Sequence, residues 1–565
     1  MNAPNVGTDE LGDSPAAVQA RWLLGLAVGD HDLDDAEWEL HMSERFRRAV
    51  TLEQFRGVLE QHRATFTAGE VVDVTHHGDV GVLVAVESPD ARLQMRCVVG
   101  RRTGTITSVM VAPTSAEVAS LDEVPALLER DGGAAVSAAF GRRGELVWEQ
   151  AWGSAGPGRP AEPATLFQAG SVSKPIAVFA ALRLVAQGRI GLDDDIADHL
   201  RSWSLPEVEG WSPRLSLRDL ASHCAGLSVW GFPGYPRGGP VATLADVLAG
   251  APPANTPPIV PEALPGLTWR YSGGGYSVLQ QVLVDVAGLP FDVLVCQEVL
   301  EPLGMTSSTM EQPLPEDRAG SEAEGWSGSG PGTLEVGWHV YPEMAAAGLW
   351  TTAADLVRFA MGVDACRAGA RPDVLPAVLA EEMVSPQPIH SSMGLGLFLG
   401  GAPARTVGHG GANAGFTSDL VWTLDGDLYA AVVSSANGTV PRAVTGLIFD
   451  QELGEKLPAS SSISVDAVVG MSAAEPETPA PDDNLDDAWQ AVAGVYRSGA
   501  RDLEIVGDGA RLSLLLPGQR PVRLVPADGI GLVVRGLGVD LSFPDTSTML
   551  LTQLGQRIEF TRIPS

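Results

Sequence analysis

The chain of 565 residues contains only two lysines, Lys174 and Lys456; the other 35 of its 37 basic side chains are arginine. A buried lysine amine can lose its proton near neutral pH, whereas an arginine guanidinium cannot. Lys174 ends the sequence Ser171-Val172-Ser173-Lys174, just before an apolar segment with helical spacing. Because residues i and i+3 share a helix face, the Lys174 amine can reach the Ser171 hydroxyl and act as its general base. The pair predicts a serine nucleophile at Ser171.

Two further segments have the residue types that such a nucleophile needs. Tyr271-Ser272-Gly273-Gly274-Gly275-Tyr276 precedes a second apolar segment with helical spacing, and Val407-Gly408-His409-Gly410-Gly411-Ala412 precedes the late strands. A tyrosine at the start of a helix can reach into a cleft as an acid or a base. Small residues on a strand let its backbone approach a substrate closely and offer N–H groups to an oxyanion.

These three segments, in this order, resemble the serine β-lactamase and penicillin-binding protein superfamily, and within it the class C-like esterases and D-aminopeptidases (the S12-like serine peptidase branch). The resemblance covers roughly residues 118–450. Supporting stretches are Leu192–Asp195, Leu217–Leu227 and Gly348–Leu356.

The resemblance implies a role for each residue that matches a motif. Ser171 would be the acylated nucleophile, Lys174 its base, and Tyr271 the group that moves a proton to the leaving group and activates the deacylating water. His409, Gly410, Gly411 and Ala412 would face the substrate, with the N–H groups of Ser171 and Ala412 as the oxyanion hole. Gly273 would also lie in the substrate-binding site.

Two positions depart from the pattern of the penicillin-recognising members. Gly273 stands where they usually have an asparagine that contacts the substrate, and His409 stands where many have a cationic lysine that pairs with the β-lactam carboxylate. A neutral histidine pairs poorly with a carboxylate. Both departures favour an esterase or amidohydrolase over an enzyme that destroys antibiotics.

Some residues near the motifs have more than one reading. Tyr276 could replace Tyr271 as the functional tyrosine, but its surroundings suit helix packing. His223 could be a base, although in Ser222-His223-Cys224-Ala225-Gly226-Leu227 a role in holding a loop by hydrogen bonds is favoured. A loop rich in proline and glycine contains Trp230, Phe232 and Tyr235. The sequence does not decide whether these aromatic residues line a substrate cleft.

Apolar periodicity predicts the elements that must position these residues. Helical spacing over 16–29, 34–48 and 52–64 is followed by four alternating strands up to 111. Strands then recur at 134–140 and 146–152 and again at 419–423 and 428–434, which predicts one antiparallel sheet built from both ends of a segment with a helical region inserted. About eight short strands follow between 492 and 561, typical of a small barrel.

We therefore predict a multidomain α+β or α/β protein. Its parts are an amino-terminal α+β domain (1–112), a β-lactamase-like serine hydrolase domain (113–456), a flexible acidic and proline-rich linker (457–487), and an antiparallel, lipocalin-like β-barrel (488–565). By resemblance to barrels joined to some D-aminopeptidases, the last domain would restrict access to the cleft or mediate homo-oligomer formation.

Composition limits the partners and the location. The formal net charge of −33 argues against binding to nucleic acid or to an anionic membrane surface. We see no signal peptide, no membrane span, no nucleophile elbow of the α/β-hydrolases and no metal-ligand pattern. The cysteines Cys97, Cys224, Cys296 and Cys366 are scattered, as expected of buried thiols in a reducing cytoplasm. We therefore expect a cytoplasmic serine hydrolase without a cofactor or metal. Its substrates would be small esters or amides, with D-amino-acid peptides among the candidates. The alternatives are an acyltransferase that uses the same site and a penicillin-binding sensor that does not turn over its ligand.

Overall fold

The computed structural model describes residues 11–43, 46–47, 52–76, 81–88, 92–100, 103–113, 120–130, 134–325, 337–400, 405–435, 440–453, 492–499, 501–507, 511–527, 531–545, 547–554 and 556–563. The linker predicted over 457–487 lies outside these residues, as does Lys456. The boundaries of the predicted domains stay predictions.

The amino-terminal part consists of helices followed by an antiparallel sheet, as the periodicity predicts. Its elements are α1 (Pro15–Val28), α2 (Asp35–His41), α4 (Leu52–Ala68), β1 (Glu70–His76), β2 (Gly81–Glu87), β3 (Arg92–Val99) and β4 (Ile106–Pro113), with the strands in the order β1-β2-β3-β4. Ser14 caps the first turn of α1 by accepting a hydrogen bond from Ala17 N, and Gly29 ends the helix in a left-handed conformation. The apolar side chains of α1 pack on the sheet and form a core with residues such as Val84 and Met95.

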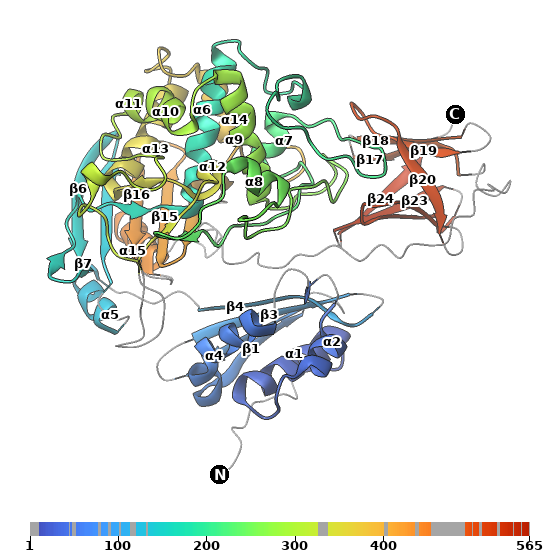
Figure 1. The fold of residues 1–565 in the computed structure, drawn as a ribbon, viewed down its shortest axis with the longest axis horizontal. Helices are drawn as coiled ribbons and strands as arrows, with labels where there is room; N and C mark the ends of the chain where they lie inside the picture. Colours follow the sequence, from blue (N-terminus) through green and yellow to red (C-terminus); the bar gives the residue numbers. More distant parts are fainter. Residues whose placement is uncertain are drawn as a thin grey trace. The chain divides into compact units, whose positions relative to one another are not determined.

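A six-stranded antiparallel sheet forms the centre of the middle part (Figure 1). Its strands are β13 (Phe398–Leu399), β14 (Thr406–Asn413), β15 (Phe416–Thr423), β16 (Leu428–Ser434), β5 (Val136–Arg142) and β6 (Glu145–Trp152), in that order across the sheet. The late strand β16 pairs directly with the early strand β5, from Leu428 opposite Arg142 to Ser434 opposite Val136. The prediction of one sheet built from both ends of the segment is confirmed.

The two faces of this sheet are buried against different helices because side chains alternate along each strand. On one face, Ala139 and Val433 join the large core that contains α6 (Ser173–Ala186) and α13 (Ala353–Arg367). On the other face, Ala138 and Val432 pack with α5 (Val124–Arg130) and α15 (Val440–Leu453). The sheet is thus the middle layer of three.

The inserted region between β6 and β13 is mainly helical. Besides α6 and α13 it contains α7 (Leu217–Ala221), α8 (Leu244–Ala249), α9 (Gly273–Ala287), α10 (Phe291–Val295), α11 (Glu301–Leu303), α12 (Met344–Ala347), α14 (Ala377–Met383), the π-helical turn η5 (Cys296–Leu300), and the 3₁₀ turns η3 (Gly170–Val172), η4 (Ile196–Asp198) and η6 (Glu316–Arg318). Its short strands are β7 (Ser154–Gly156) with β8 (Arg159–Pro160), β9 (Phe167–Gln168) with β12 (Trp350–Thr351), and β10 (Tyr235–Pro236) with β11 (His339–Val340).

The carboxyl-terminal part is a closed antiparallel barrel of eight strands within the described residues. They are β17 (Gly494–Ser498), β18 (Arg501–Gly507), β19 (Leu512–Leu515), β20 (Val522–Ala527), β21 (Gly531–Val534), β22 (Val539–Ser542), β23 (Thr548–Gln553) and β24 (Gln556–Arg562). The first strand closes on the last through Tyr496 opposite Arg562. The predicted barrel is confirmed.

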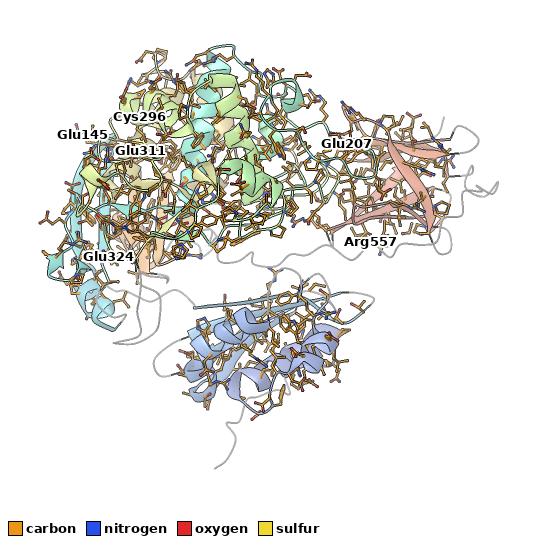
Figure 2. All side chains as sticks on the ribbon, viewed as in Figure 1. Glu145, Glu207, Cys296, Glu311, Glu324 and Arg557 are labelled. Carbon is orange, nitrogen blue, oxygen red and sulfur yellow. The ribbon has the colours of Figure 1, made fainter. Side chains whose placement is uncertain are left out.

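The surface carries much of the acidic charge. Glu145, Glu207 and Glu311, labelled in Figure 2, are all exposed. Three of the four cysteines are buried thiols, but Cys296 is partly exposed, contrary to the expectation for all four. In the described parts of the chain no single helix could cross a membrane by length and hydropathy; only the pair Gly273–Ala287 and Phe291–Leu303, bent by 80°, meets that test together.

Candidate active site

Ser171 lies in a tight turn that leads straight into a buried helix. The 3₁₀ turn η3 continues into α6 from Ser173, and Ser173 Oγ donates to Gly170 O at 2.6 Å, which fixes the junction. Gly170 has φ of +50°, a backbone conformation that glycine adopts easily. Ser171 is only 8% exposed. Its hydroxyl is therefore held on a rigid element at the edge of the core.

Lys174 lies one helical turn after Ser171, as the i, i+3 spacing predicts. Its Nζ is 2.8 Å from Ser171 Oγ, and it also donates to the carbonyl oxygen of Ala346 at 2.8 Å. Burial lowers the pKa of Lys174 to about 7. A neutral amine keeps one N–H for Ala346 and directs its lone pair to the serine hydroxyl. The pair is thus poised for proton transfer near neutral pH.

Tyr271 lies on the other side of the lysine, directly before α9. Lys174 Nζ is 4.9 Å from the centre of its ring. The buried Tyr271 hydroxyl makes no well-formed hydrogen bond with the described residues. Burial raises its pKa, although the nearby Ser171 side chain lowers it slightly. A phenol that stays protonated next to the Ser171 side chain can donate a proton to a group bound there.

Tyr276, the alternative tyrosine, has a packing role in the structure. Its hydroxyl donates to the carbonyl oxygen of Ala221 at 2.9 Å, and the side chain is fully buried. Its ring also lies beside Lys174, with Nζ 5.5 Å from the ring centre. The two tyrosines therefore enclose the amine, but only the Tyr271 hydroxyl is free to act.

His409 lies on β14 and is almost completely buried. Its Nδ1 is 2.5 Å from Gly410 O, and because a carbonyl only accepts, Nδ1 carries the proton. Its Nε2 has no hydrogen-bond partner among the described residues. Burial, and next the charge of Lys174, lower the pKa of His409 to about 3. The ring is thus neutral at physiological pH and presents a free lone pair.

The backbone of β14 touches the backbone that leads to Ser171. A Cβ on Gly411 would lie 1.9 Å from Ala169 O, and a Cβ on Gly170 would lie 2.6 Å from Ala412 N. Ser418 on β15 donates its hydroxyl to the same Ala169 oxygen at 2.7 Å. Glycine at 411 therefore accommodates the turn before the nucleophile, which is a different reason from the close approach of a substrate that the sequence suggested. Ala412, the next residue, is exposed.

Gly273 faces a loop of the protein in the structure. A Cβ there would lie 2.9 Å from Trp230 O and 3.1 Å from the Phe232 ring. Trp230 and Phe232 are partly exposed, and the Trp230 ring centre is 5.7 Å from that of Tyr271. These two aromatic residues border the site, whereas Tyr235 is buried and accepts a hydrogen bond from Asn255 N.

Sequence reasoning missed Glu343, which precedes α12, the helix whose Ala346 carbonyl binds Lys174. Glu343 is completely buried, and neither carboxylate oxygen has a hydrogen-bond partner among the described residues. Burial raises its pKa to about 7. Glu343 makes no hydrogen bond to Lys174, and the pKa of the lysine is lowered by burial. A glutamate between Pro342 and Met344 gives no sign of burial in the sequence.

We expect Glu343→Gln to stabilise the protein at alkaline pH. Because the folded pKa lies above the unfolded value of 4.5, folding favours the protonated acid, and this contribution is lost as the pH rises through about 7. Urea unfolding should show the variant gaining up to about 3 kcal/mol at pH 8 and little at pH 5. The exposed Glu145→Gln is the matched control and should change neither value. An equal effect of Glu343→Gln at both pH values would contradict the assignment.

The chain is similar to known protein families and to proteins of known structure. Residues 122–455 match the profile of the Beta-lactamase family, and residues 11–103 match that of the ORF 12 gene product N-terminal family. Esterase EstB of Burkholderia gladioli is 33% identical over 29% of this chain and 44% of its own length, so the chain spans less than half of that relative. Penicillin-binding protein 4 of Amycolatopsis lactamdurans is 26% identical over 52% of this chain and 77% of its own length. The octameric penicillin-binding protein homologue from Pyrococcus abyssi has the same fold over 78% of this chain and 98% of its own, with a TM-score of 0.50 and 19% identity.

Proposed function

Because this chain belongs to the Beta-lactamase family, we propose that it is a serine hydrolase that cleaves small esters or amides through an acyl-enzyme on Ser171. The observation that carries the proposal is the 2.8 Å contact between Ser171 Oγ and the Nζ of a fully buried lysine. The esterase among the relatives supports ester substrates. For the amide class we propose peptides that contain D-amino acids.

In acylation, neutral Lys174 takes the proton of Ser171 Oγ as the oxygen attacks the substrate carbonyl carbon. The carbonyl oxygen becomes an oxyanion, which the N–H groups of Ser171 and Ala412 would bind. The contact between the Gly170 and Ala412 backbones supports this arrangement. Tyr271 donates its proton to the leaving group as the bond to it breaks, and the tyrosine regains a proton from the lysine ammonium.

In deacylation, water attacks the ester that Ser171 has formed. The water loses its proton to the Lys174 and Tyr271 pair, the same oxyanion hole binds the developing charge, and Ser171 Oγ leaves with a proton returned to it. The acid is released and the enzyme is ready for another turn.

The residues around the nucleophile support a preference for substrates without a carboxylate near the reacting bond. His409 is neutral, because burial holds its pKa at about 3, so it supplies no positive charge to such a group. The Trp230 and Phe232 loop occupies the space next to Gly273. We therefore propose an esterase or amidase in preference to a β-lactamase.

A fluorophosphonate probe tests the proposal, because it forms a covalent adduct only with an activated serine. We expect the intact chain to be labelled, the adduct to map to Ser171, and Ser171→Ala to lose both labelling and hydrolysis of p-nitrophenyl acetate. Labelling of the wild type without turnover would favour a sensor, or a transferase that lacks its acceptor. Absence of labelling in the folded wild type would refute the proposed nucleophile.

A further inference from the structure

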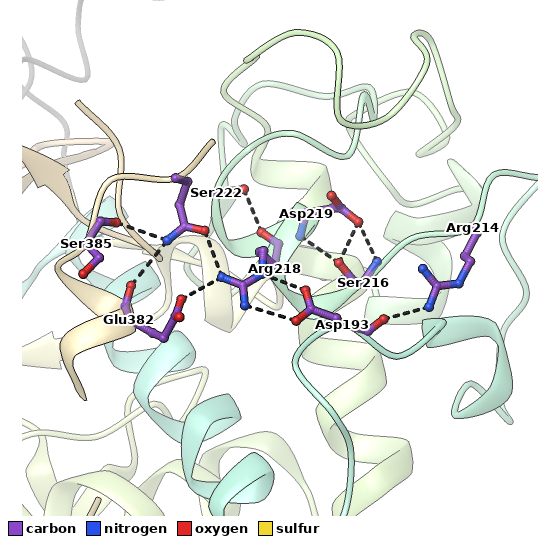
Figure 3. A network of polar contacts seen from close by, with 9 residues as sticks. Asp193, Arg214, Ser216, Arg218, Asp219, Ser222, Glu382 and Ser385 are labelled. Atoms are coloured by element: carbon purple, nitrogen blue, oxygen red, sulfur yellow. Dashed lines mark hydrogen bonds and ion pairs between the residues drawn. The ribbon is translucent and has the colours of Figure 1, made fainter. Parts of the chain in front are cut away.

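A polar network anchors the short segment that follows α7. In Figure 3, Arg218 lies between Asp193 and Glu382, with distances of 2.7 Å from Arg218 Nε to Asp193 Oδ1 and 2.7 Å from Arg218 Nη1 to Glu382 Oε2. Ser222 Oγ donates to Arg218 O at 2.7 Å. Ser216 and Asp219 close the capping box of the same helix. Three stretches of chain therefore fix where the residue after Ser222 lies.

That residue is His223, and it accepts hydrogen bonds from the backbone N–H groups of the two residues that flank Tyr271 in the sequence. The N–H of Arg270 donates to His223 O at 2.9 Å, and the N–H of Ser272 donates to His223 Nδ1 at 3.1 Å. The imidazole also stacks on the Tyr271 ring, with centres 4.2 Å apart and planes 30° from parallel. The expectation that His223 holds a loop by hydrogen bonds agrees with these contacts, and the loop carries Tyr271.

The backbone of His223 adopts a left-handed conformation that is uncommon outside glycine, asparagine, aspartate and histidine. Its φ is +60°, and the side chain is 2% exposed. Strained, buried residues persist where the surrounding structure holds them, and they cluster at functional sites. In this conformation the imidazole lies against the Tyr271 ring.

The ring of His223 is neutral. Burial, and then electrostatic coupling to Lys174 and to His409, lower the pKa of His223 well below its usual value. The other titratable groups facing it are Tyr271 and Tyr276, through ring contacts. Since Nδ1 accepts a hydrogen bond, Nε2 carries the proton. The ring thus adds no positive charge beside Lys174, which must itself become neutral.

We infer that His223 is a positioning residue for Tyr271: it holds the backbone N–H groups of Arg270 and Ser272, on either side of the tyrosine, and packs on the face of its ring, and thereby sets where the phenol lies relative to Ser171. The inference rests on the proposed function, in which Tyr271 transfers protons. The inference also assigns a role to the Arg218 network, because that network fixes the segment from which His223 extends.

A double-mutant cycle with Tyr271→Phe tests the inference. His223→Ala should lower the single-turnover acylation rate with p-nitrophenyl acetate about 30-fold, with KM changed less than about threefold. His223→Asn should recover most of that rate, because its side-chain oxygen can accept the Ser272 N–H and asparagine tolerates positive φ. In the Tyr271→Phe background, either substitution at His223 should change the rate by less than about twofold.

Two results would overturn the inference. One is a loss on His223 substitution that is the same size in the Tyr271→Phe background as in the wild type, because the histidine would then not act through the tyrosine. The other is a His223→Asn variant that is as impaired as His223→Ala although both give wild-type thermal unfolding. Should His223→Ala not fold, His223→Leu, which also lacks a hydrogen-bond acceptor, takes its place in the cycle. Failure of the proposed function is read separately, from absence of fluorophosphonate labelling at Ser171 in the wild type.

Discussion

Lys174→Arg is expected to reduce ester hydrolysis by about 10³-fold or more, although it keeps the positive charge. Arginine stays protonated at every pH at which the protein is folded, so it cannot accept the Ser171 proton. Its guanidinium is also larger than the ammonium, and it would have to fit between Ser171 Oγ and Ala346 O, each 2.8 Å from Nζ in the structure. The reaction would retain only what the oxyanion hole and substrate binding supply.

The pH dependence of the wild type tests the same role independently. Because burial lowers the pKa of Lys174 to about 7, the base is neutral above that pH and protonated below it. The value of kcat/KM should therefore fall about tenfold per pH unit as the pH drops below about 7.

Lys456→Arg, at the other lysine of the chain, is the matched control for Lys174→Arg and should behave as wild type. A Lys174→Arg variant within tenfold of wild-type activity would show that another group activates Ser171.

The motif residues could be predicted because their chemistry depends on side-chain type and spacing. The separation of three residues predicts that Ser171 and Lys174 share a helix face. Apolar periodicity predicts the helix that Tyr271 precedes. The two-ended sheet followed in the same way from alternating segments near 136 and 430. Each of these features has a local pattern in the sequence.

Other parts of the site have no such pattern. The Ala346 carbonyl that binds Lys174 is a main-chain group, which every residue type has. The identity of residue 346 therefore does not predict this hydrogen bond. The burial of Glu343 depends on how α12 packs against α6 and α9, far away in the chain. Gly273 and Gly411 are predicted to face the substrate, but the sequence does not show that Trp230 and Phe232 lie next to Gly273 or that Ala169 lies next to Gly411. A glycine in a sequence can indicate that there is no room for a side chain, but it does not show which residue occupies the space.

Gly411→Ala is expected to disrupt the catalytic part of the chain strongly. The added Cβ would lie 1.9 Å from Ala169 O and 2.5 Å from Ser418 Oγ. Ser418 could rotate, but its hydroxyl would then leave Ala169 O, a bond of 2.7 Å. The carbonyl itself belongs to the backbone that enters η3, so it can move only together with Ser171. We expect a loss of about 2–5 kcal/mol in the free energy of unfolding.

The same substitution should impair chemistry in the molecules that remain folded. Separating β14 from η3 moves the Ala412 N–H away from that of Ser171, and loss of one oxyanion donor typically lowers kcat by about 10²–10³-fold. Urea unfolding measures the first effect, and the rate of fluorophosphonate labelling per folded molecule measures the second. Gly446→Ala on α15 is the control, because a Cβ there meets nothing within 4 Å and helix propensity predicts a gain of about 0.5–1 kcal/mol. If Gly411→Ala kept both wild-type stability and wild-type labelling, β14 and the nucleophile turn could separate freely, and the close backbone contact would not be what holds the two N–H groups together.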